Sequence, residues 1–320
     1  MRIVCGWWCV VFASVATAAV APSLRGPEDT QTDADAQTID DRELAKIVER
    51  EGGALLEPGG FLSAEELLEG RGELAIAQLA DAPDKEMTEA ELYETARRGV
   101  LVVRELYKCD NCPRWHTAGG GTAFVLSADG VCVTNYHMFE SRGQEHKVYP
   151  IVLTADGEVF TVKEVLAASR PDDVAIFRLG NGRKDGEEID VGTHVFTPIP
   201  LAESAPIGTR VGLIAHPDNE CYTFTTGIIA RRSLAHRGIN GESGENDDVP
   251  AINVTCEYGV GSSGGPVMDM RGRAVGMVCN THTVWSGEGR RREPQMVRRR
   301  CIPSDRIMLL LASPPPKVQD

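Results

Sequence analysis

The sequence has no excess of positive charge and, beyond its first 21 residues, no long apolar run. Across its 320 residues, 47 acidic side chains outnumber 33 basic ones, and the formal net charge is -14. This charge argues against nucleic acid or an anionic membrane as a partner. No segment after residue 21 approaches the roughly 20 apolar residues that span a bilayer, so we expect no stable membrane insertion. The ordinary hydrophobic content, 42%, is enough for one sizeable packed domain with an appendage.

The first 21 residues have the composition of a secretory signal peptide. Arg2 precedes a short apolar run, and small residues at 16–18 and 19–21 offer two A-x-A cleavage sites. A retained membrane anchor is the alternative, but the run is short and ends in alanines, which favours cleavage. We therefore expect a secreted or periplasmic protein. Residues 22–39 are polar and acidic and are expected to form a disordered linker.

Residues 40–98 show the spacing of short helices. Asp40 precedes apolar residues at helical spacing, and Gly52 is expected to end that helix. Capping boxes that begin at Ser63 and Thr88 predict two further helices. This helical N-terminal extension contains no catalytic constellation, so a docking segment and an inhibitory pro-region both remain open.

From residue 100 onward the apolar period becomes that of β-strands. Runs at 100–106, 122–127, 131–135, 148–154 and 158–162 are short, and Asp-Gly pairs at 129–130 and 156–157 are hairpin signals. Further runs follow at 174–179, 210–214, 222–230, 251–255 and 273–278. This pattern predicts an all-β domain of antiparallel strands. Prolines after Ser313 end any final helix, and residues 313–320 are expected to be a disordered tail.

Three stretches carry residues suited to nucleophilic catalysis. Residues 259–266, GVGSSGGP, place Ser263 among glycines, which permit a tight turn and free backbone N–H groups. An apolar strand ends at His137, and a second apolar run begins with Asp172 and Asp173. His137 can take the proton of Ser263, and an aspartate can hold the imidazole ring in place. We favour Asp173 over Asp172, and we expect the N–H groups of Gly261 and Ser263 to form an oxyanion hole.

A G-x-S-x-G turn also occurs in α/β-hydrolases, where the nucleophile comes first and the histidine last. Here only His282 follows Ser263, about one hairpin later, and the upstream motifs would have no role. The order His, Asp, Ser is instead the order of the chymotrypsin-type triad.

These motifs give the chain its resemblance to a known family. GGGTAFVLSADGVCVTNYH, DDVAIFRL and GSSGGPVMDMRGRAVGMV resemble trypsin-like serine proteases of the mostly bacterial HtrA/Do branch, over residues 99–312. The resemblance implies two antiparallel six-stranded barrels with the triad in the cleft between them. It also implies a serine endopeptidase that cleaves proteins or peptides through an acyl-enzyme without a cofactor. No room is expected for a PDZ domain. The alternative is a catalytically inactive protease fold that binds peptides or acts as a chaperone.

The same resemblance suggests where substrate side chains bind. The pocket wall is expected near Glu257, Val278 and Asn280. Glu257 lies six residues before Ser263, which leaves a Lys/Arg preference open, while Val278 stands where glutamate-specific relatives carry histidine. A small or medium apolar side chain is the default expectation. Ser262 is uncharged and cannot pair with a new terminal amine, so we expect no trypsin-type zymogen activation; the oxyanion loop is either preformed or ordered by substrate or partner contact.

Seven cysteines remain after residue 21, so at least one thiol is unpaired within the chain. We predict a disulfide between Cys109 and Cys112. With His116 these residues offer three metal ligands, but zinc usually takes a fourth and thioredoxin-like chemistry needs a βαβ context, so no metal is predicted. Cys132 and Cys279 alternate with valines and are expected in the core.

Arginines gather at residues 290–292 and 298–300 near the C-terminus. We expect this stretch to be a solvated face that contacts the acidic N-terminal segment within the same chain.

Overall fold

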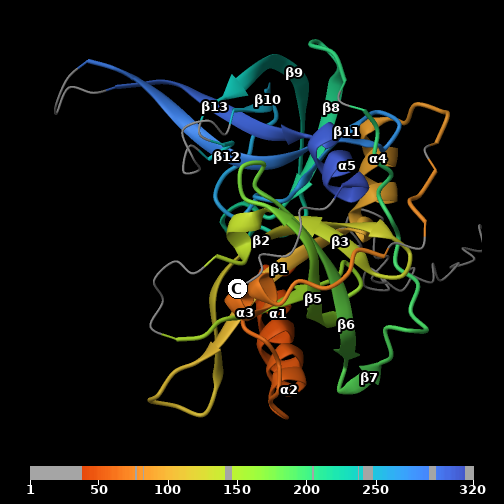
Figure 1. The fold of residues 1–320 in the computed structure, drawn as a ribbon, viewed down its shortest axis with the longest axis vertical. Helices are drawn as coiled ribbons and strands as arrows, with labels where there is room; N and C mark the ends of the chain where they lie inside the picture. The colour runs from red at the N-terminus through yellow and green to blue at the C-terminus, as the bar shows by residue number, and fades with distance from the viewer. Residues whose placement is uncertain are drawn as a thin grey trace, which may run out of the picture. The chain divides into compact units, whose positions relative to one another are not determined.

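The computed structural model describes residues 38–75, 78–81, 83–140, 146–203, 205–236, 238–240, 248–287 and 293–313 (Figure 1). The chain divides into two units, residues 1–39 and 40–320. Only Thr38 and Ile39 of the first unit are among the described residues, so the predicted signal peptide and nearly all of the predicted linker lie outside them. The predicted tail lies outside them too, except for Ser313. All elements named below belong to the second unit. None of the helices in the described ranges is long and apolar enough to cross a membrane.

The N-terminal extension begins with a helix that continues further than the sequence suggests. Helix α1, Asp41–Ile47, is capped by the Asp40 carboxylate, which accepts the N–H groups of two first-turn residues. The chain then continues through a π-helical segment, η2 (Val48–Gly52), into α2 (Gly53–Leu56). The prediction that Gly52 ends the helix is therefore wrong. A Cβ at Gly52 would lie 2.3 Å from Cδ1 of Ile151, so glycine stands here because the helix packs closely on a strand.

Two capping boxes place the other helices of the extension, as predicted. Helix α3, Ala64–Glu69, starts at Ser63, and helix α4, Glu89–Ala96, starts at Thr88; both halves of each box are formed. Each helix buries a leucine completely, Leu67 in α3 and Leu92 in α4. A short 3-10 turn, η3 (Arg97–Gly99), leads from α4 directly into the first strand. The extension is therefore packed on the β-domain.

The first sheet closes into a ring of six antiparallel strands. Its strand order is β3-β2-β1-β4-β5-β6-β7, and an additional pairing of β3 with β6 closes the ring. The short strand β7 extends β6 at the edge. The strands are β1 (Val100–Lys108), β2 (Trp115–Ser127), β3 (Val131–Thr134), β4 (Tyr149–Leu153), β5 (Val159–Ser169), β6 (Val174–Lys184) and β7 (Glu187–Ile189). Gly130 and Gly157 have positive φ angles at the predicted hairpin turns.

The second sheet is a closed barrel of six antiparallel strands in the order β10-β13-β12-β11-β8-β9. Its strands are β8 (Arg210–Ala215), β9 (Thr223–Ala235), β10 (Val249–Val254), β11 (Pro266–Asp269), β12 (Ala274–Ser286) and β13 (Glu293–Pro303). Helix α5, Ser304–Ala312, follows β13. The predicted all-β architecture of two six-stranded barrels with a short helical extension is confirmed.

Candidate active site

His137 and Asp173 are joined by hydrogen bonds at the rim of the first barrel. His137 lies in a 3-10 turn, η4 (Tyr136–Met138), directly after β3, and Asp173 takes a left-handed conformation (φ 56°) directly before β6. The Asp173 carboxylate accepts the backbone N–H of His137 at 3.0 Å, and its two oxygens lie 3.0 and 2.9 Å from Nδ1 of the ring. A neutral ring that donates from Nδ1 presents Nε2 as its basic atom, which is the tautomer that a general base requires.

The neighbouring carboxylate, Asp172, has a different partner. Arg306 of α5 binds it with both forks of the guanidinium, Nε to Oδ1 at 2.6 Å and Nη2 to Oδ2 at 3.1 Å. The Ser169 hydroxyl donates to the same carboxylate at 2.8 Å. The structure therefore brings Asp173 to His137, whereas Asp172 is bound by an arginine of the C-terminal helix.

Cys279 adds a contact to Asp173 that sequence analysis missed. Its thiol lies 3.3 Å from Oδ2 of Asp173 and 3.0 Å from the side-chain oxygen of Asn240. Burial, with the Asp173 carboxylate as the next cause, raises the pKa of this thiol well above its ordinary value, so it stays protonated, and its one S–H can donate to either oxygen. The sequence predicts a buried core cysteine, and the residue is buried, but no sequence signal pointed to the polar role.

Ser263 stands on a tight turn between the two barrels. Gly261 and Gly264 on either side have φ angles of +94° and +87°, and a Cβ at Gly264 would lie 1.9 Å from the backbone oxygen of Thr122. No other residue type fits that approach. The Thr122 N–H donates to the Ser263 carbonyl at 2.8 Å, and the Ser263 hydroxyl donates to the Cys279 carbonyl at 3.1 Å. The turn therefore rests directly on strands β2 and β12.

Backbone contacts hold the residues before Ser263 in place. The carbonyl of Val260 accepts the N–H of Asp218 at 2.8 Å, and the carbonyl of Gly261 accepts the Thr122 hydroxyl at 2.9 Å. In the part of the chain that the structure describes, the N–H groups of Gly261 and Ser263 have no recorded acceptor. Two unpaired N–H groups on a fixed turn are the arrangement that an oxyanion hole needs.

One cavity of about 640 Å³ brings these groups together. His137, Gly261, Ser263 and Cys279 all line it. Its charged lining residues, Glu140 and Arg170, form an ion pair at 2.9 Å. The other lining side chains are neutral: Asn240, Tyr258, Asn280 and Thr281 are polar, and Met138 and Val260 are apolar.

Only one of the three predicted pocket residues lies at this cavity. Asn280 lines it and donates to the Asn240 side chain at 3.1 Å. Glu257 is not among the lining residues; its exposed carboxylate pairs with Arg299. Val278 is also absent from the lining because its side chain is buried among the apolar residues of the second barrel. Neither of these two residues lines the cavity that Ser263 lines.

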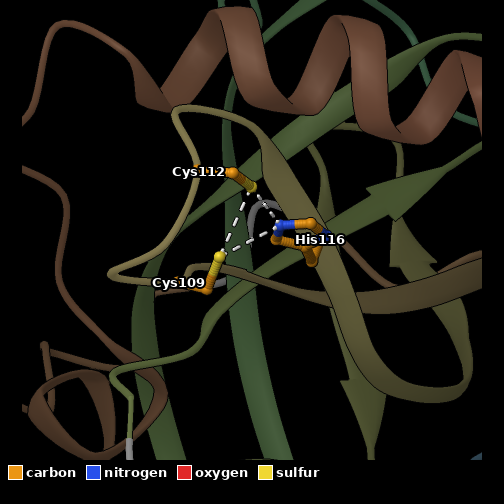
Figure 2. Close-up of side chains that lie close together, drawn as sticks. All are labelled: Cys109, Cys112 and His116. Atoms are coloured by element: carbon orange, nitrogen blue, oxygen red, sulfur yellow. Dashed lines mark hydrogen bonds between the residues drawn. The ribbon is translucent and has the colours of Figure 1, made fainter.

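Cys109, Cys112 and His116 converge at the tip of the β1–β2 hairpin, as Figure 2 shows. The two sulfur atoms lie 3.4 Å apart and are not bonded, so the predicted disulfide stays a prediction. Nε2 of His116 lies 3.4 Å from the sulfur of Cys109 and 2.9 Å from that of Cys112. The hydrogen bond from Cys112 lowers the pKa of the Cys109 thiol.

The predicted contact between the acidic N-terminal segment and the arginine-rich stretch involves residues outside the described ranges on both sides. Residues 22–37 and 290–292 are among them. Of the described arginines, Arg299 pairs with Glu257, and Arg300 donates to the Ile239 carbonyl at 2.8 Å. The long-range contact stays a prediction.

Residues 121–277 match the family model described as the trypsin-like peptidase domain. Among curated proteins, the chain is 30% identical over 161 residues to "Protease Do-like 1, chloroplastic" of Arabidopsis thaliana, covering 50% of this chain and 32% of the relative. It is 27% identical over 177 residues to a "Probable periplasmic serine endoprotease DegP-like" of Chlamydia trachomatis, covering 55% and 31%. It is also 27% identical over 198 residues to "Serine protease HTRA1" of Xenopus tropicalis, covering 61% and 36%. The chain thus spans about a third of the length of these relatives.

Proposed function

This chain carries a trypsin-like peptidase domain and is related to serine proteases of the HtrA and Do group, and from that premise we propose that it is a serine endopeptidase with Ser263 as its nucleophile. His137 is the general base, Asp173 orients the base, and the N–H groups of Gly261 and Ser263 stabilise the oxyanion. The observation that carries the proposal is the hydrogen-bonded pair of His137 and Asp173 at the cavity that Ser263 also lines.

The reaction proceeds in two steps. Nε2 of His137 takes the hydroxyl proton while Oγ of Ser263 attacks the scissile carbonyl, and the resulting oxyanion is held by the two backbone N–H groups. His137 then gives the proton to the leaving amine, which leaves an acyl-enzyme on Ser263. In the second step a water molecule, deprotonated by His137, hydrolyses the ester and restores the serine. No cofactor takes part.

The neutral lining of the cavity bears on the substrate. Because Glu140 and Arg170 pair with each other, neither presents an uncompensated charge to a substrate side chain. Glu257, the acid that would select lysine or arginine, points to Arg299. We therefore propose a preference for small or medium neutral side chains in protein or peptide substrates. We also propose export to the periplasm or the exterior, which accords with the N-terminal composition and with the relative from Chlamydia trachomatis that is named as periplasmic.

A serine-directed fluorophosphonate probe tests the proposal. We expect the protein to be labelled at one site, and we expect Ser263→Ala to abolish labelling and peptide cleavage. His137→Ala should do the same, with a loss of about 10⁴-fold or more in turnover. Ser262→Ala is the matched control because that side chain is fully buried and its hydroxyl has no recorded partner among the described residues. Folding of each variant is checked by thermal melting.

The alternative function, an inactive fold that binds peptides or acts as a chaperone, gives the opposite result. A folded protein that takes no label and cleaves no member of a peptide library, yet still binds peptides, would establish that alternative. Labelling that persists in Ser263→Ala would contradict the choice of nucleophile.

A further inference from the structure

The cluster of Cys109, Cys112 and His116 takes no part in the proposed peptidase chemistry. It is the one group of three or more potential metal ligands within the described ranges whose ligand atoms all lie within 4.8 Å of one another. Both sulfur atoms and Nε2 of His116 point to a common centre from the two sides of the turn between β1 and β2 (Figure 2). All three side chains are half-buried, so a small ion and water can reach them.

The separations within the cluster fit the edges of a metal coordination shell. Tetrahedral zinc, with Zn–S of about 2.3 Å and Zn–N of about 2.0–2.1 Å, places two sulfurs about 3.8 Å apart and a sulfur and a nitrogen about 3.6 Å apart. The observed separations are 3.4 Å between the sulfurs and 3.4 and 2.9 Å between sulfur and nitrogen. A disulfide needs about 2.05 Å. The sulfurs are therefore nearer to the spacing of two ligands than to that of a covalent bond.

The two sulfur atoms and Nε2 of His116 form a triangle whose size also fits one bound metal ion. The circle through the three atoms has a radius of about 1.9 Å, which is shorter than a Zn–S bond. A cation can therefore reach all three ligands from a position about 1 Å out of their plane, with only small side-chain adjustments. Two thiolates would balance the charge of a divalent cation, and thiolate with imidazole is a donor set that zinc prefers.

We propose that Cys109, Cys112 and His116 bind one zinc ion, with a water molecule in the fourth position. Tyr107 supports the site, since its ring lies against that of His116 with the centroids 5.4 Å apart. Zinc with three protein ligands and one exchangeable position is known from catalytic zinc sites. The site uses the same thiols as the predicted disulfide, and the two uses exclude each other in one molecule.

The position of the cluster suggests what zinc does for the protein. His116 lies on β2, and four residues further along that strand Gly120 lines the cavity that contains Ser263. The next residue, Gly121, lies so close to the Ser263 carbonyl that a Cβ there would be 3.1 Å from it. Zinc would close the turn of this hairpin and restrict the strand that forms one wall of the cavity. This role rests on the proposed function, whereas zinc binding itself does not.

Metal titration of the reduced full chain tests the binding. We expect one zinc ion per chain by elemental analysis after dialysis, and a thiolate-to-cobalt charge-transfer band when Co²⁺ is added in place of zinc. Cys109→Ser, Cys112→Ser and His116→Gln should each weaken zinc binding by about 100-fold or more. His236→Gln is the matched control, because His236 is exposed and pairs with Asp248 away from the hairpin. Zinc should raise the melting temperature of the wild type and the control, and not that of the three variants.

Two results would overturn the proposal. One is a reduced, folded protein that takes up no zinc, or takes it up equally in the double variant Cys109→Ser/Cys112→Ser. The other is a native-host protein whose peptide carries a disulfide, seen as a loss of two hydrogens by mass spectrometry, with no bound metal. Because both readouts follow the metal and the thiols, they are independent of whether the chain cleaves peptides.

Discussion

At the scale of single residues, Asp173 contacts a thiol as well as His137. Cys279 donates to Oδ2 of Asp173 at 3.3 Å from a buried position. We predict that Cys279→Ala lowers kcat/KM about 10-fold, because a buried carboxylate that loses a donor loses about 1–2 kcal/mol of stabilisation. Cys279→Ser should restore most of the activity, since a hydroxyl donates in the same place. Peptide-cleavage kinetics on all three proteins provide the measurement.

The activities of the Cys279 variants distinguish a hydrogen bond to Asp173 from simple packing. Cys279→Val fills the space without a donor and should be as impaired as Cys279→Ala. If the valine variant is as active as the serine variant, Cys279 acts by packing alone, and the contact with Asp173 is incidental.

At the scale of elements, helix α1 is hydrogen-bonded to the turn that contacts the loop before Ser263. The Asp41 carboxylate accepts the N–H of Cys221 at 2.8 Å, and within the same turn the N–H of Asp218 donates to the Val260 carbonyl at 2.8 Å. Val260 directly precedes Gly261. The extension thus contacts the loop that precedes Ser263 through one intermediate turn.

We predict that Asp41→Ala destabilises the protein by about 1 kcal/mol and lowers kcat/KM several-fold, because the turn loses a charge-assisted hydrogen bond. Glu43→Ala is the control: it lies on the same helix and pairs with Lys46 at an exposed position. Melting temperature and cleavage rate are measured for both. Equal activity of the two variants would show that the turn keeps the oxyanion loop in place without the helix. Activity that required a free amine at a newly cut terminus would replace docking with zymogen activation.

At the scale of the whole molecule, a buried histidine makes the fold sensitive to acid. Burial, with a smaller contribution from the Arg104 charge, lowers the pKa of His216 from 6.5 to about 3. The ring is neutral in the folded protein, and its Nδ1 accepts the N–H of Tyr222 at 2.9 Å. In the unfolded chain the same ring takes up a proton below pH 6.5. Acid therefore favours unfolding through this residue.

The contribution of His216 to stability is fully present above pH 6.5 and is lost as the pH falls from 6.5 towards 3. In this window the unfolded state binds one more proton, so the free energy of unfolding falls by about 1.4 kcal/mol per pH unit from this residue. His216→Asn keeps an acceptor for the Tyr222 N–H but does not titrate. Urea unfolding at pH 7, 6 and 5 should show a shallower pH dependence for the variant. Equal slopes for variant and wild type would contradict a neutral buried ring.

Local signals in the sequence determined where helices α1, α3 and α4 begin and where two hairpins turn. The capping boxes at Ser63 and Thr88 and the Asp-Gly turns at 129–130 and 156–157 act over a few residues, so each could be identified without knowledge of the fold. The same holds for the glycine-flanked Ser263, because the requirement for positive φ lies in the turn itself.

Contacts between distant residues were decided only by the tertiary structure. Strand β13 carries arginines at positions where a buried strand would carry apolar residues, so its sequence has no clear strand pattern. It is a strand because it pairs with β10 and β12. The sequence favoured Asp173 as the partner of His137, but only the structure shows that Asp172 pairs with Arg306, which is 134 positions away.

Contacts between distant residues also explain why the predictions for the pocket residues and for Gly52 differ from the structure. Glu257 follows β10 in a loop and pairs with Arg299 of β13, while Val278 of β12 is buried among the apolar residues of the second barrel, so neither side chain lines the cavity. Gly52 lies inside the helical segment, where Ile151 leaves no room for a side chain, so this glycine serves close packing and not helix termination. A sequence specifies turns, caps and periodicity through neighbours along the chain, whereas the partner of a side chain depends on which strands the barrels bring together.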